Sequence, residues 1–473
     1  MHTLPFFYDY VFPNVILPNA LPPEMGVVNY MHTLYSNRLD TESFFDQDLE
    51  LELNPMQRMF GNTFGDWPNS IRNGGTFLMQ KCFHSLVHIK ENSVYFGKRS
   101  NFIGRYVYPI KVTPHFARFT GVDKIGSKLN GEFFWKHISA EVLNDVRSGC
   151  ALIFLDWGQE NFIERQEYID FHSGLKNSGI PKSQIILAIN SFNAKAVYEE
   201  WFPEDERCIE VHNFPFLISH MSYHYTEHAD WRLTEESFRQ SRNTIRQDYF
   251  IYPIRRARDH RIALLHKLAS DGILEKGDWS CLDKVGIQHG LHMSSTHQFT
   301  NLDQERLTQL HDQIPRPLRE EPDSNYLNVA GWRDRHSRQS ENSYFYIASE
   351  TYVHGVYKSL TEKIFKPLIN FQPFIFLAFP GALNELRRLG FKTFSPFINE
   401  DYDNEQDLYT RMKMMSDEIS RLCSMSKEDI HNWYWSMEEI LIHNHRHLLT
   451  IHKNEPNTAA LVRYLYDRLL APS

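Results

Sequence analysis

The sequence predicts an α/β protein of two domains, each built around a parallel β-sheet. The chain has 473 residues, more than one ordinary hydrophobic core accommodates. Short apolar segments alternate with helical patterns between residues 151 and 213, and a second alternation starts at residue 249. Strands that alternate with helices form parallel sheets with right-handed crossovers, so both stretches predict this type of sheet.

The first alternation begins with the apolar segment 151–155, which is typical of a buried strand. A helical pattern follows, and then a second strand is predicted at 184–189. A helix at 194–201 and a strand at 208–211 complete the series. Further upstream, the segment 93–112 alternates aromatic and polar residues, which indicates additional strands.

The second alternation begins with a strand at 249–254 and a helix at 260–270. Asp259 is placed to cap this helix, and Gly272 suits the left-handed position after its last turn. Between the two alternations, the polar stretch 220–247 is expected to connect the domains, with one helix at 235–242.

Three more strands are predicted at 344–349, 374–377 and 391–394. A helix is expected to open near Ser359, because a serine followed three residues later by Glu362 is a capping-box pattern. A short helix is also expected after Gly381, ending at Gly390, and the tail from about residue 404 to 470 has helical patterns. The predicted divisions are a first domain at 1–243, a second at 244–425 and C-terminal helices at 426–473.

Charge and composition exclude several classes of protein. The formal net charge is −9, which argues against a surface that binds nucleic acid. The five cysteines are scattered without a CxxC pair, which favours a reducing compartment over a disulfide framework or a zinc site. No apolar segment reaches membrane-spanning length and no signal peptide is recognisable, so a cytoplasmic location is the simplest expectation.

A cluster of cations lies where the strand 249–254 ends and the next helix begins. Guanidinium groups bind phosphate oxygens in pairs, and a helix N-terminus adds amide donors and a favourable dipole. We therefore expect an anion site there, and the alternative is a solvated basic surface. The arginines of this cluster are Arg255, Arg256, Arg258 and Arg261.

A second polar group follows the predicted strand 344–349. A carboxylate can accept hydrogen bonds from both hydroxyls of a ribose, and an adjacent lysine can contact a diphosphate. For Glu362 the alternative is a helix cap, and for Lys366 it is a lysine that only faces solvent. The members of this group are Ser349, Glu350, Thr351, Thr361, Glu362, Lys363 and Lys366.

The stretch 343–402 contains SETYVHGVYKSLTEKIFKP and GALNELRRLGFKTF. It resembles the donor-binding half of GT-B glycosyltransferases, in particular a group of bacterial and large-DNA-virus enzymes with the pattern S/T-E-T, TEKxFKP and LGFKTF. The α1,3-fucosyltransferases carry a shorter relative of this pattern. Upstream, PIRRARDHRIALLHKL resembles the arginine-rich segment of the same group. The resemblance covers roughly residues 245–420.

The resemblance implies a GT-B fold, in which two Rossmann-like domains face each other across a cleft. It also implies transfer of a sugar from a nucleotide-sugar donor to a glycan or polysaccharide hydroxyl. No metal or other cofactor is expected, because cationic side chains and a helix dipole take the place of a divalent metal in GT-B sites. Glu362 would hold the ribose, and Lys363 with the arginines would hold the diphosphate. Glu350 would face the donor sugar or nucleoside. GDP- and UDP-linked donors, carrying fucose or xylose, both fit, and inversion is expected.

The catalytic base must come from the first domain, because it takes a proton from the acceptor hydroxyl on the other side of the donor. Asp156 follows the predicted strand 151–155, and Asp156 and Glu160 are the candidates, with His212 as a weaker one. The alternative for each acid is a helix cap or a surface carboxylate. A catalytically silent GT-B-like protein that binds carbohydrate or nucleotide is the competing function, since only an enzyme needs this base.

Two patterns that suggest metal ligands are given little weight. Asp401-Tyr402-Asp403 is a DxD string, but it heads an acidic stretch and is expected to be solvated. The histidines lack the HExxH spacing of a helical zinc site and are expected to pack or to face solvent. These histidines are His289, His292 and His297, and His443, His445 and His447.

Overall fold

The structure is a computed structural model that describes residues 3–8, 93–98, 104–111, 140–157, 163–182, 184–227, 232–255, 257–282, 299, 302–319, 337–453 and 455–470. The chain forms two compact units. The first unit combines Met1–His220 with His452–Ser473, and the second unit is Met221–Ile451. Each unit contains one sheet, and the strands of both sheets pair in parallel.

The first unit has a six-stranded sheet in the order β2-β1-β3-β4-β5-β6. The strands predicted at 151–155 and 184–189 are confirmed, and the one predicted at 208–211 lies two residues later. Strands are also present within the segment 93–112, as its pattern indicates. The bounds are β1 (Thr3–Tyr8), β2 (Ser93–Lys98), β3 (Tyr106–Lys111), β4 (Ala151–Trp157), β5 (Ile185–Ile189) and β6 (Glu210–Asn213).

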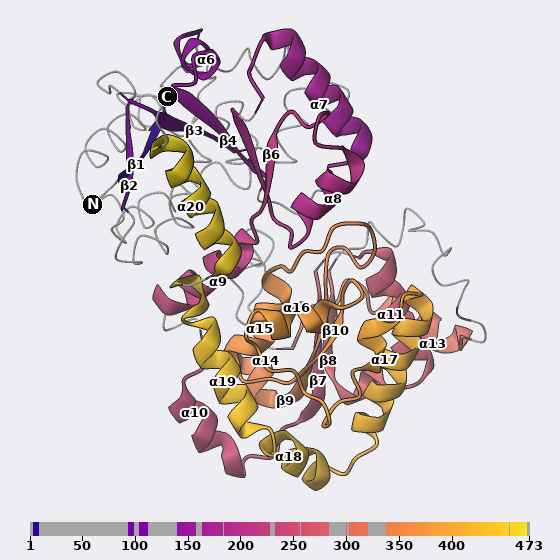
Figure 1. Ribbon diagram of the computed structural model, residues 1–473. Helices are drawn as coiled ribbons and strands as arrows, with labels where there is room; N and C mark the ends of the chain where they lie inside the picture. Colours follow the sequence, from indigo (N-terminus) through magenta and orange to yellow (C-terminus); the bar gives the residue numbers. More distant parts are fainter. Residues whose placement is uncertain are drawn as a thin grey trace, which may run out of the picture. The chain divides into compact units, whose positions relative to one another are not determined.

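Helices cover both faces of this sheet. Helices α7 (Arg165–Ser178) and α8 (Ala194–Trp201) lie on one side, and α20 (Pro456–Leu470) lies on the other (Figure 1). Helix α6 (Ala140–Arg147) leads into β4. Because both faces are covered, residues 151–155 of β4 and all of β5 are apolar and buried, which is why their sequences predict strands so clearly.

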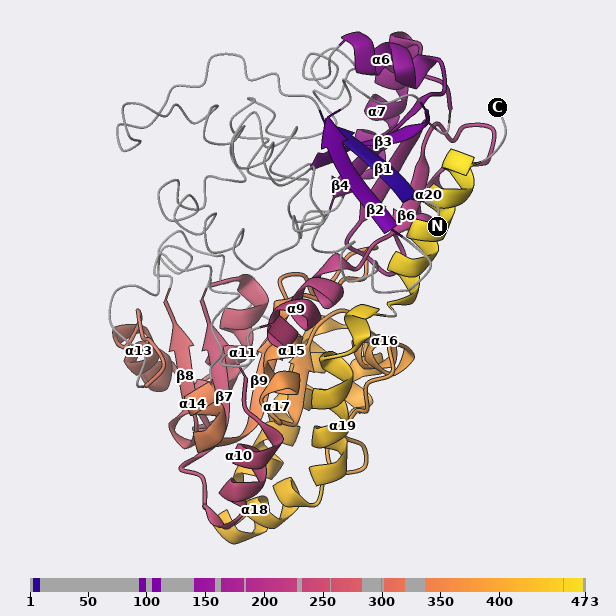
Figure 2. The same cartoon turned by 90° about the vertical axis from the view of Figure 1, so that its left-hand side faces the viewer.

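The second unit has a four-stranded sheet in the order β10-β9-β7-β8. Strands β7 (Asp248–Ile254), β9 (Ser343–Ser349) and β10 (Phe374–Leu377) confirm three predictions. Strand β8 (Asp278–Cys281) was not predicted, and it forms one edge of the sheet (Figure 2). Every residue of β9 is buried, as expected for a central parallel strand.

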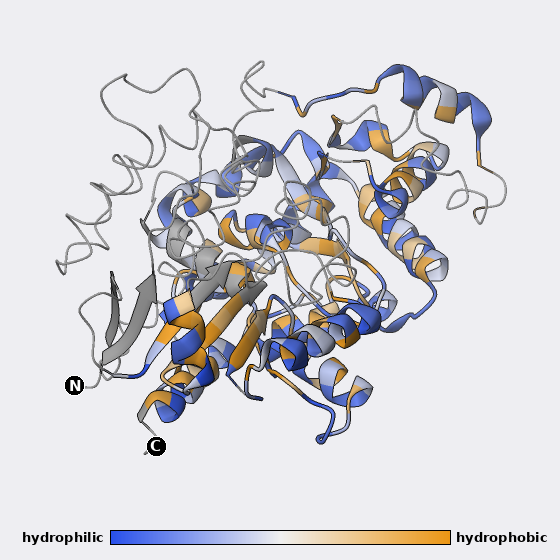
Figure 3. Ribbon diagram, turned by 90° about the horizontal axis from the view of Figure 1, so that it is seen from above, coloured by the Kyte–Doolittle hydropathy of each residue, from blue (hydrophilic) through white to orange (hydrophobic). Residues whose placement is uncertain are grey.

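Helices also lie on both sides of the second sheet, seen edge-on in Figure 1. Coloured by hydropathy, the strands near the two termini, in the first unit, are largely apolar, and the helices carry polar residues on their outward faces (Figure 3). On one side lie α11 (Asp259–Ser270), α13 (Gln304–Asp312) and α17 (Leu408–Cys423), and on the other α14 (Ser337–Asn342), α15 (Glu362–Ile369) and α19 (Glu438–Leu448). The unit also contains α10 (Glu235–Gln240), α16 (Ala382–Arg388) and α18 (Lys427–Trp435), and α9 (Phe216–Glu227) spans the boundary between the units.

The predicted strand at 391–394 is wrong. The backbone N–H of Lys392 donates to Asn444 Oδ1 at 2.8 Å, and the Lys392 carbonyl accepts from Asn444 Nδ2 at 2.8 Å. The N–H of Phe394 donates to Glu400 Oε1 at 2.6 Å. Side chains thus satisfy the backbone groups that a neighbouring strand would bind, so this apolar segment needs no sheet.

Two predicted helix starts are shifted. Helix α15 begins at Glu362 with Thr361 as its N-cap, and the capping box expected from Ser359 does not form. Helix α11 begins at Asp259, and Arg258 occupies the N-cap position in place of Asp259. Gly272 does adopt the left-handed conformation expected after α11, with φ of 71°.

The compact units do not coincide with the divisions expected at 243/244 and 425/426. Helix α10 belongs to the second unit, because the Phe238 ring stacks on Phe371 at 4.5 Å and on Trp435 at 4.8 Å between centroids. Helix α20 belongs to the first unit, where the rings of Tyr464 and His212 lie 4.5 Å apart. Aromatic contacts between distant segments decide both memberships, and sequence position does not reveal them.

One buried arginine joins several elements of the second unit. Arg246 Nη1 donates to the carbonyls of Ser340 and Ser343 at 2.7 and 2.6 Å, and Nη2 donates to the Tyr434 hydroxyl at 2.7 Å. Its guanidinium also lies 4.0 Å from the centroid of the Tyr434 ring. Arg246 therefore ties the segment before β7 to α14, β9 and α18.

We expect Arg246→Ala to lower the free energy of unfolding by about 3 kcal/mol, because it removes three buried hydrogen bonds of a charged group together with its packing on Tyr434. Urea unfolding and the melting temperature measure this change. The matched control is Arg239→Ala in α10, whose side chain is 57% exposed and only pairs with Glu438 at 3.7 Å. That control should cost less than about 1 kcal/mol. Equal stability of the two variants would contradict the role of Arg246.

Candidate functional site

Parallel strands of the second unit end at one edge of its sheet, where the polar groups singled out from the sequence follow them. Strand β7 leads into Arg255, β9 into Glu350 and β10 into Ala378. Helices α11 and α15 begin close to these strand ends. Ligands of open α/β sheets bind beyond the carboxyl ends of the strands, and helix N-termini attract anions.

Two arginines of the predicted cluster lie at this edge, just before α11. Arg255 is half-buried, and within the described part of the chain it has no hydrogen-bond or ion-pair partner. Arg258 is the N-cap residue of α11, and its guanidinium lies 5.4 Å from the centroid of the Tyr352 ring. Arg256 lies outside the described residues.

Arg261 has a different role from the one expected. Its side chain is buried, and Nη2 donates to the carbonyls of Ser349 and Glu350 at 3.1 and 3.0 Å. The neighbouring His260 Nε2 donates to the Glu350 carbonyl at 2.8 Å. Burial, reinforced by the charge of Arg261, lowers the pKa of His260 to about 3, so the ring is neutral. The side chains of His260 and Arg261, in the first turn of α11, thus hold the end of β9 and do not point to a ligand site.

Glu350 is the most deeply placed member of the site, with a side chain that is only 1% exposed. Its Oε1 accepts the Thr361 N–H at 2.8 Å, and Oε2 accepts the Thr361 hydroxyl at 2.6 Å and the Thr351 N–H at 3.2 Å. Burial raises the pKa of Glu350, and the charge of Lys363 opposes that rise. The carboxylate therefore closes the loop 351–361 at both ends.

Glu362 and Lys363 reach the surface where α15 begins. Lys363 Nζ donates to Glu362 Oε1 at 2.8 Å and to Thr361 Oγ1 at 2.9 Å, and the two charged side chains are 19–20% exposed. Burial alone would raise the pKa of Glu362, but the charges of Lys363 and Lys366 outweigh it and hold this pKa below its usual value. An ionised carboxylate and an ammonium group thus stand together at the helix N-terminus.

The remaining members of the predicted set lie beneath this surface. Ser349 Oγ is 3.1 Å from the Tyr252 hydroxyl, and Lys366 is buried within α15. Thr351 and Thr361 are buried as partners of Glu350. The residues of the sequence motif therefore lie close together, but most of them are buried and support the surface residues Glu362 and Lys363.

Sequence reasoning missed Arg411 in α17. It is buried, and Nη1 donates to the carbonyls of Ala378 and, at 3.5 Å, Val353. Ala378 directly follows β10, so a second buried arginine binds the strand ends from α17. A signal was present in the sequence, because Arg411 falls on the same helical face as the apolar residues Met415 and Ile419.

In the first unit, the candidates for a catalytic base are described only in part. Asp156 lies in one register row with Ala188 and His212 across β4, β5 and β6. The side chain of Asp156 and all of Glu160 lie outside the described residues. Burial, with the charge of Lys195, lowers the pKa of His212 to about 4, and its Nε2 is buried without a hydrogen-bond partner. His212 is therefore neutral at neutral pH, and its lowered pKa makes it a weak base.

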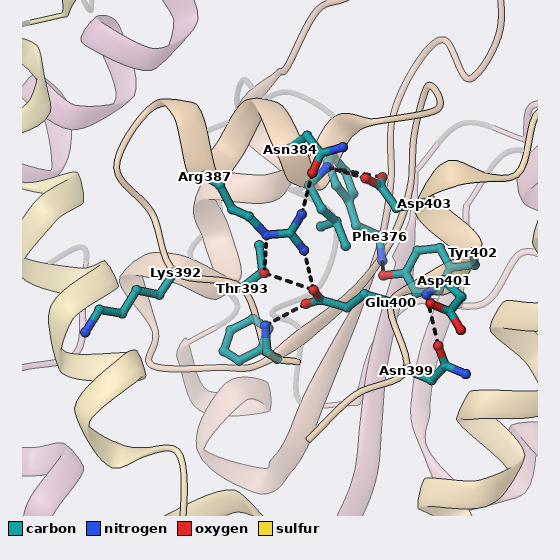
Figure 4. Close-up of polar contacts among 12 residues, drawn as sticks. Phe376, Asn384, Arg387, Lys392, Thr393, Asn399, Glu400, Asp401, Tyr402 and Asp403 are labelled. Carbon is teal, nitrogen blue, oxygen red and sulfur yellow. Dashed lines mark hydrogen bonds and ion pairs between the residues drawn. The ribbon is translucent and has the colours of Figure 1, made fainter. Parts of the chain in front are cut away.

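The DxD string has structural contacts, shown in Figure 4. Both carboxylate oxygens of Asp403 accept the Leu383 N–H at 3.1 Å, in the first turn of α16. The Tyr402 hydroxyl accepts the Phe376 N–H at 3.1 Å, and the Asp401 N–H donates to Asn399 Oδ1 at 2.9 Å. The expectation that the whole string is solvated is therefore corrected, since Asp403 and Tyr402 are buried.

The histidines of the tail bind backbone carbonyls. His443 and His447 donate from Nε2 to Gly390 and Leu389 at 2.9 and 2.7 Å, and His445 donates from Nδ1 to Ile369 at 3.0 Å. The group 289–297 lies outside the described residues. Where the structure describes the chain, no three His, Cys, Asp or Glu side chains gather as a metal site, and no described helix is long and apolar enough to cross a membrane.

No family model matches the sequence, and no curated protein matches it. Among solved structures, the chain is similar to the N-terminal domain of a trehalose-6-phosphate phosphatase from Candida albicans, at 7% identity and a TM-score of 0.38 over 78% of this chain and 72% of that one. It is also similar to a UDP-forming α,α-trehalose-phosphate synthase from Burkholderia xenovorans, at 10% identity and a TM-score of 0.35 over 76% and 74%. A synthase from Burkholderia multivorans gives 11% identity and a TM-score of 0.35 over 82% and 74%.

The fold assignment rests on the elements themselves. Two parallel sheets, each with helices on both sides, and a helical C-terminal tail confirm the α/β class with two Rossmann-like units. The cleft expected between the domains stays a prediction.

Asp403 supplies a test of the contacts around α16. Burial raises its pKa from 3.8 to about 6. Between these two pH values, the Asp403 carboxyl is protonated in the folded chain and ionised in the unfolded chain. The stability that this proton contributes is complete below pH 3.8 and disappears as the pH rises through 6. We expect the unfolding free energy of the wild type, relative to Asp403→Asn, to fall by up to about 3 kcal/mol between pH 4 and 7.

Urea unfolding at pH 4, 5, 6 and 7 measures this difference. Asp401→Asn, at the exposed position two residues earlier, is the matched control for loss of a carboxylate. A difference between wild type and Asp403→Asn that stays constant over this range would contradict the buried, proton-binding state of Asp403.

Proposed function

We propose that the strand-end edge of the second unit binds the nucleoside diphosphate of a sugar donor, and that the protein is a glycosyltransferase. One observation carries this proposal. Arg255, which has no partner among the described residues, lies with the N-cap residue Arg258 at the start of α11, and the pair Glu362–Lys363 lies at the start of α15. These two helix starts are joined through Glu350 and its hydrogen bonds.

The chemistry of these groups suits a departing diphosphate. Negative charge grows on the leaving group as the glycosidic bond breaks, and cations with helix N-termini stabilise it. Arg255 and Arg258 can bind phosphate oxygens in pairs, and Lys363 supplies a point charge. The ionised Glu362 can accept hydrogen bonds from the ribose hydroxyls. In this proposal the cations take the place of a divalent metal, and Arg261, Glu350 and the buried threonines position the groups that contact the donor.

The finer features of the reaction extend this proposal. The donor is a GDP- or UDP-linked sugar, with fucose and xylose as the first to test, and the acceptor is a glycan hydroxyl. Transfer proceeds with inversion, and Asp156, Glu160 or His212 of the first unit takes the acceptor proton. A cytoplasmic location stays part of the proposal.

Nucleotide binding tests the site directly. We expect UDP or GDP, but not CMP, to raise the melting temperature, because a ligand that binds only the folded state stabilises it by mass action. Arg255→Ala and Lys363→Ala should each weaken the affinity by about 10- to 100-fold, the usual loss when a charged hydrogen bond is removed.

The matched controls are Arg388→Ala in α16 and Lys413→Ala in α17, whose side chains are at least half exposed. These controls should leave the affinity within about 2-fold of wild type, since surface charges contribute little. The proposal fails if neither UDP nor GDP binds, or if the controls weaken binding as much as the site variants.

Transfer itself is tested with pooled GDP- and UDP-sugars and a glycan acceptor pool. Loss of the base should lower the rate by about 100-fold or more without weakening nucleotide affinity, so one of Asp156→Asn, Glu160→Gln and His212→Asn should show this pattern. Nucleotide binding without any transfer or donor hydrolysis in the wild type would instead identify a catalytically silent binding protein.

A further inference from the structure

Arg411 is a buried cation, and no acid among the described residues forms an ion pair with it. Its side chain is 2% exposed. It binds backbone carbonyls only, those of Ala378 and Val353 through Nη1 and that of Gln406 through Nη2 at 3.4 Å. Its Nε is buried without a partner.

The carbonyls that Arg411 binds belong to the candidate site. Ala378 is the first residue after β10, and Val353 lies in the loop 351–361 that follows β9. Arg261 binds the carbonyls of Ser349 and Glu350 in the same way from α11. Helices α11 and α17 lie on the same side of the sheet (Figure 1), so two guanidinium groups secure the strand ends from one side.

The cost of burying the positive charge of Arg411 suggests that a bound anion compensates it. A buried charge without a partner is unfavourable, and carbonyl dipoles offset only part of that cost. The acids that act on Arg411, namely Asp403, Glu405 and Asp407, do so without an ion pair. An anion bound at the strand ends would interact with this charge through the interior, where screening by water is weak.

We propose that Arg411 is a positioning residue of the anion site, and that a bound diphosphate completes its charge balance. Arg411 fixes the loop 351–361 against the end of β10, and its positive charge lies beneath the ligand. This inference rests on the proposed function, because it requires the diphosphate to bind at this edge. Its consequence is selective, since removal of the charge should weaken binding of a diphosphate more than binding of a neutral nucleoside.

The test compares Arg411→Met, which removes the charge at similar volume, with Arg411→Lys, which keeps it. Titration calorimetry at 50 and 200 mM NaCl measures the affinity for UDP and uridine, or for GDP and guanosine if the wild type prefers guanine. We expect Arg411→Met to weaken diphosphate binding about 10-fold and nucleoside binding less than about 2-fold. Arg411→Lys should restore diphosphate affinity to within about 3-fold of wild type.

Arg246→Met is the matched control for loss of a buried guanidinium elsewhere in the same unit, and it should change neither affinity while the protein is folded. If Arg411→Met does not fold, the diphosphate affinity of Arg411→Lys tests the inference. A 10-fold loss of that affinity in folded Arg411→Lys overturns the inference. Unchanged diphosphate affinity in Arg411→Met, or equal losses for nucleotide and nucleoside, also overturns it. Absence of wild-type binding to UDP, GDP and inorganic pyrophosphate refutes the proposed function instead.

Discussion

The buried carboxylate of Glu350 is the interaction on which the candidate site depends. It accepts two hydrogen bonds from Thr361 and one from Thr351, and thereby joins the end of β9 to the start of α15. The position of that helix start determines where Glu362 and Lys363 stand. Because the carboxylate is removed from water, each of these hydrogen bonds is costly to lose, and the loop between them is held at both ends.

The charges around Glu350 do not cancel. Arg261 and Arg411 donate hydrogen bonds to backbone carbonyls, which carry no full charge. Lys363 forms an ion pair with Glu362, whereas Arg255 has no partner among the described residues. An excess of positive charge therefore remains where two helices begin. In the proposed function, a bound anion balances this excess of positive charge.

The strands of the second unit were predictable where burial on both faces gave apolar segments, as in β7, β9 and β10. The same criterion failed for 391–394, because its backbone binds Asn444 and Glu400 from distant parts of the sequence. It also failed for β8, which opens with Asp278, a buried acid that pairs with Arg319. Side-chain partners that are distant in the sequence explain the wrong strand at 391–394 and the missed strand β8, and local composition does not reveal such partners.

For the candidate site, the sequence indicated which residues lie at the strand ends but not how deeply each of them is buried. Glu350 and Glu362 are both acids in one motif, yet three hydrogen bonds bury the first, and Lys363 holds the second at the surface. Arg255 and Arg261 are separated by five residues, yet one has no partner among the described residues and the other binds the end of β9. Depth follows from which backbone groups need partners after the strands have paired, and that demand arises only in the folded chain. A motif at strand ends therefore contains residues that reach the surface and residues that hold those in place, and only tertiary hydrogen bonds distinguish the two groups.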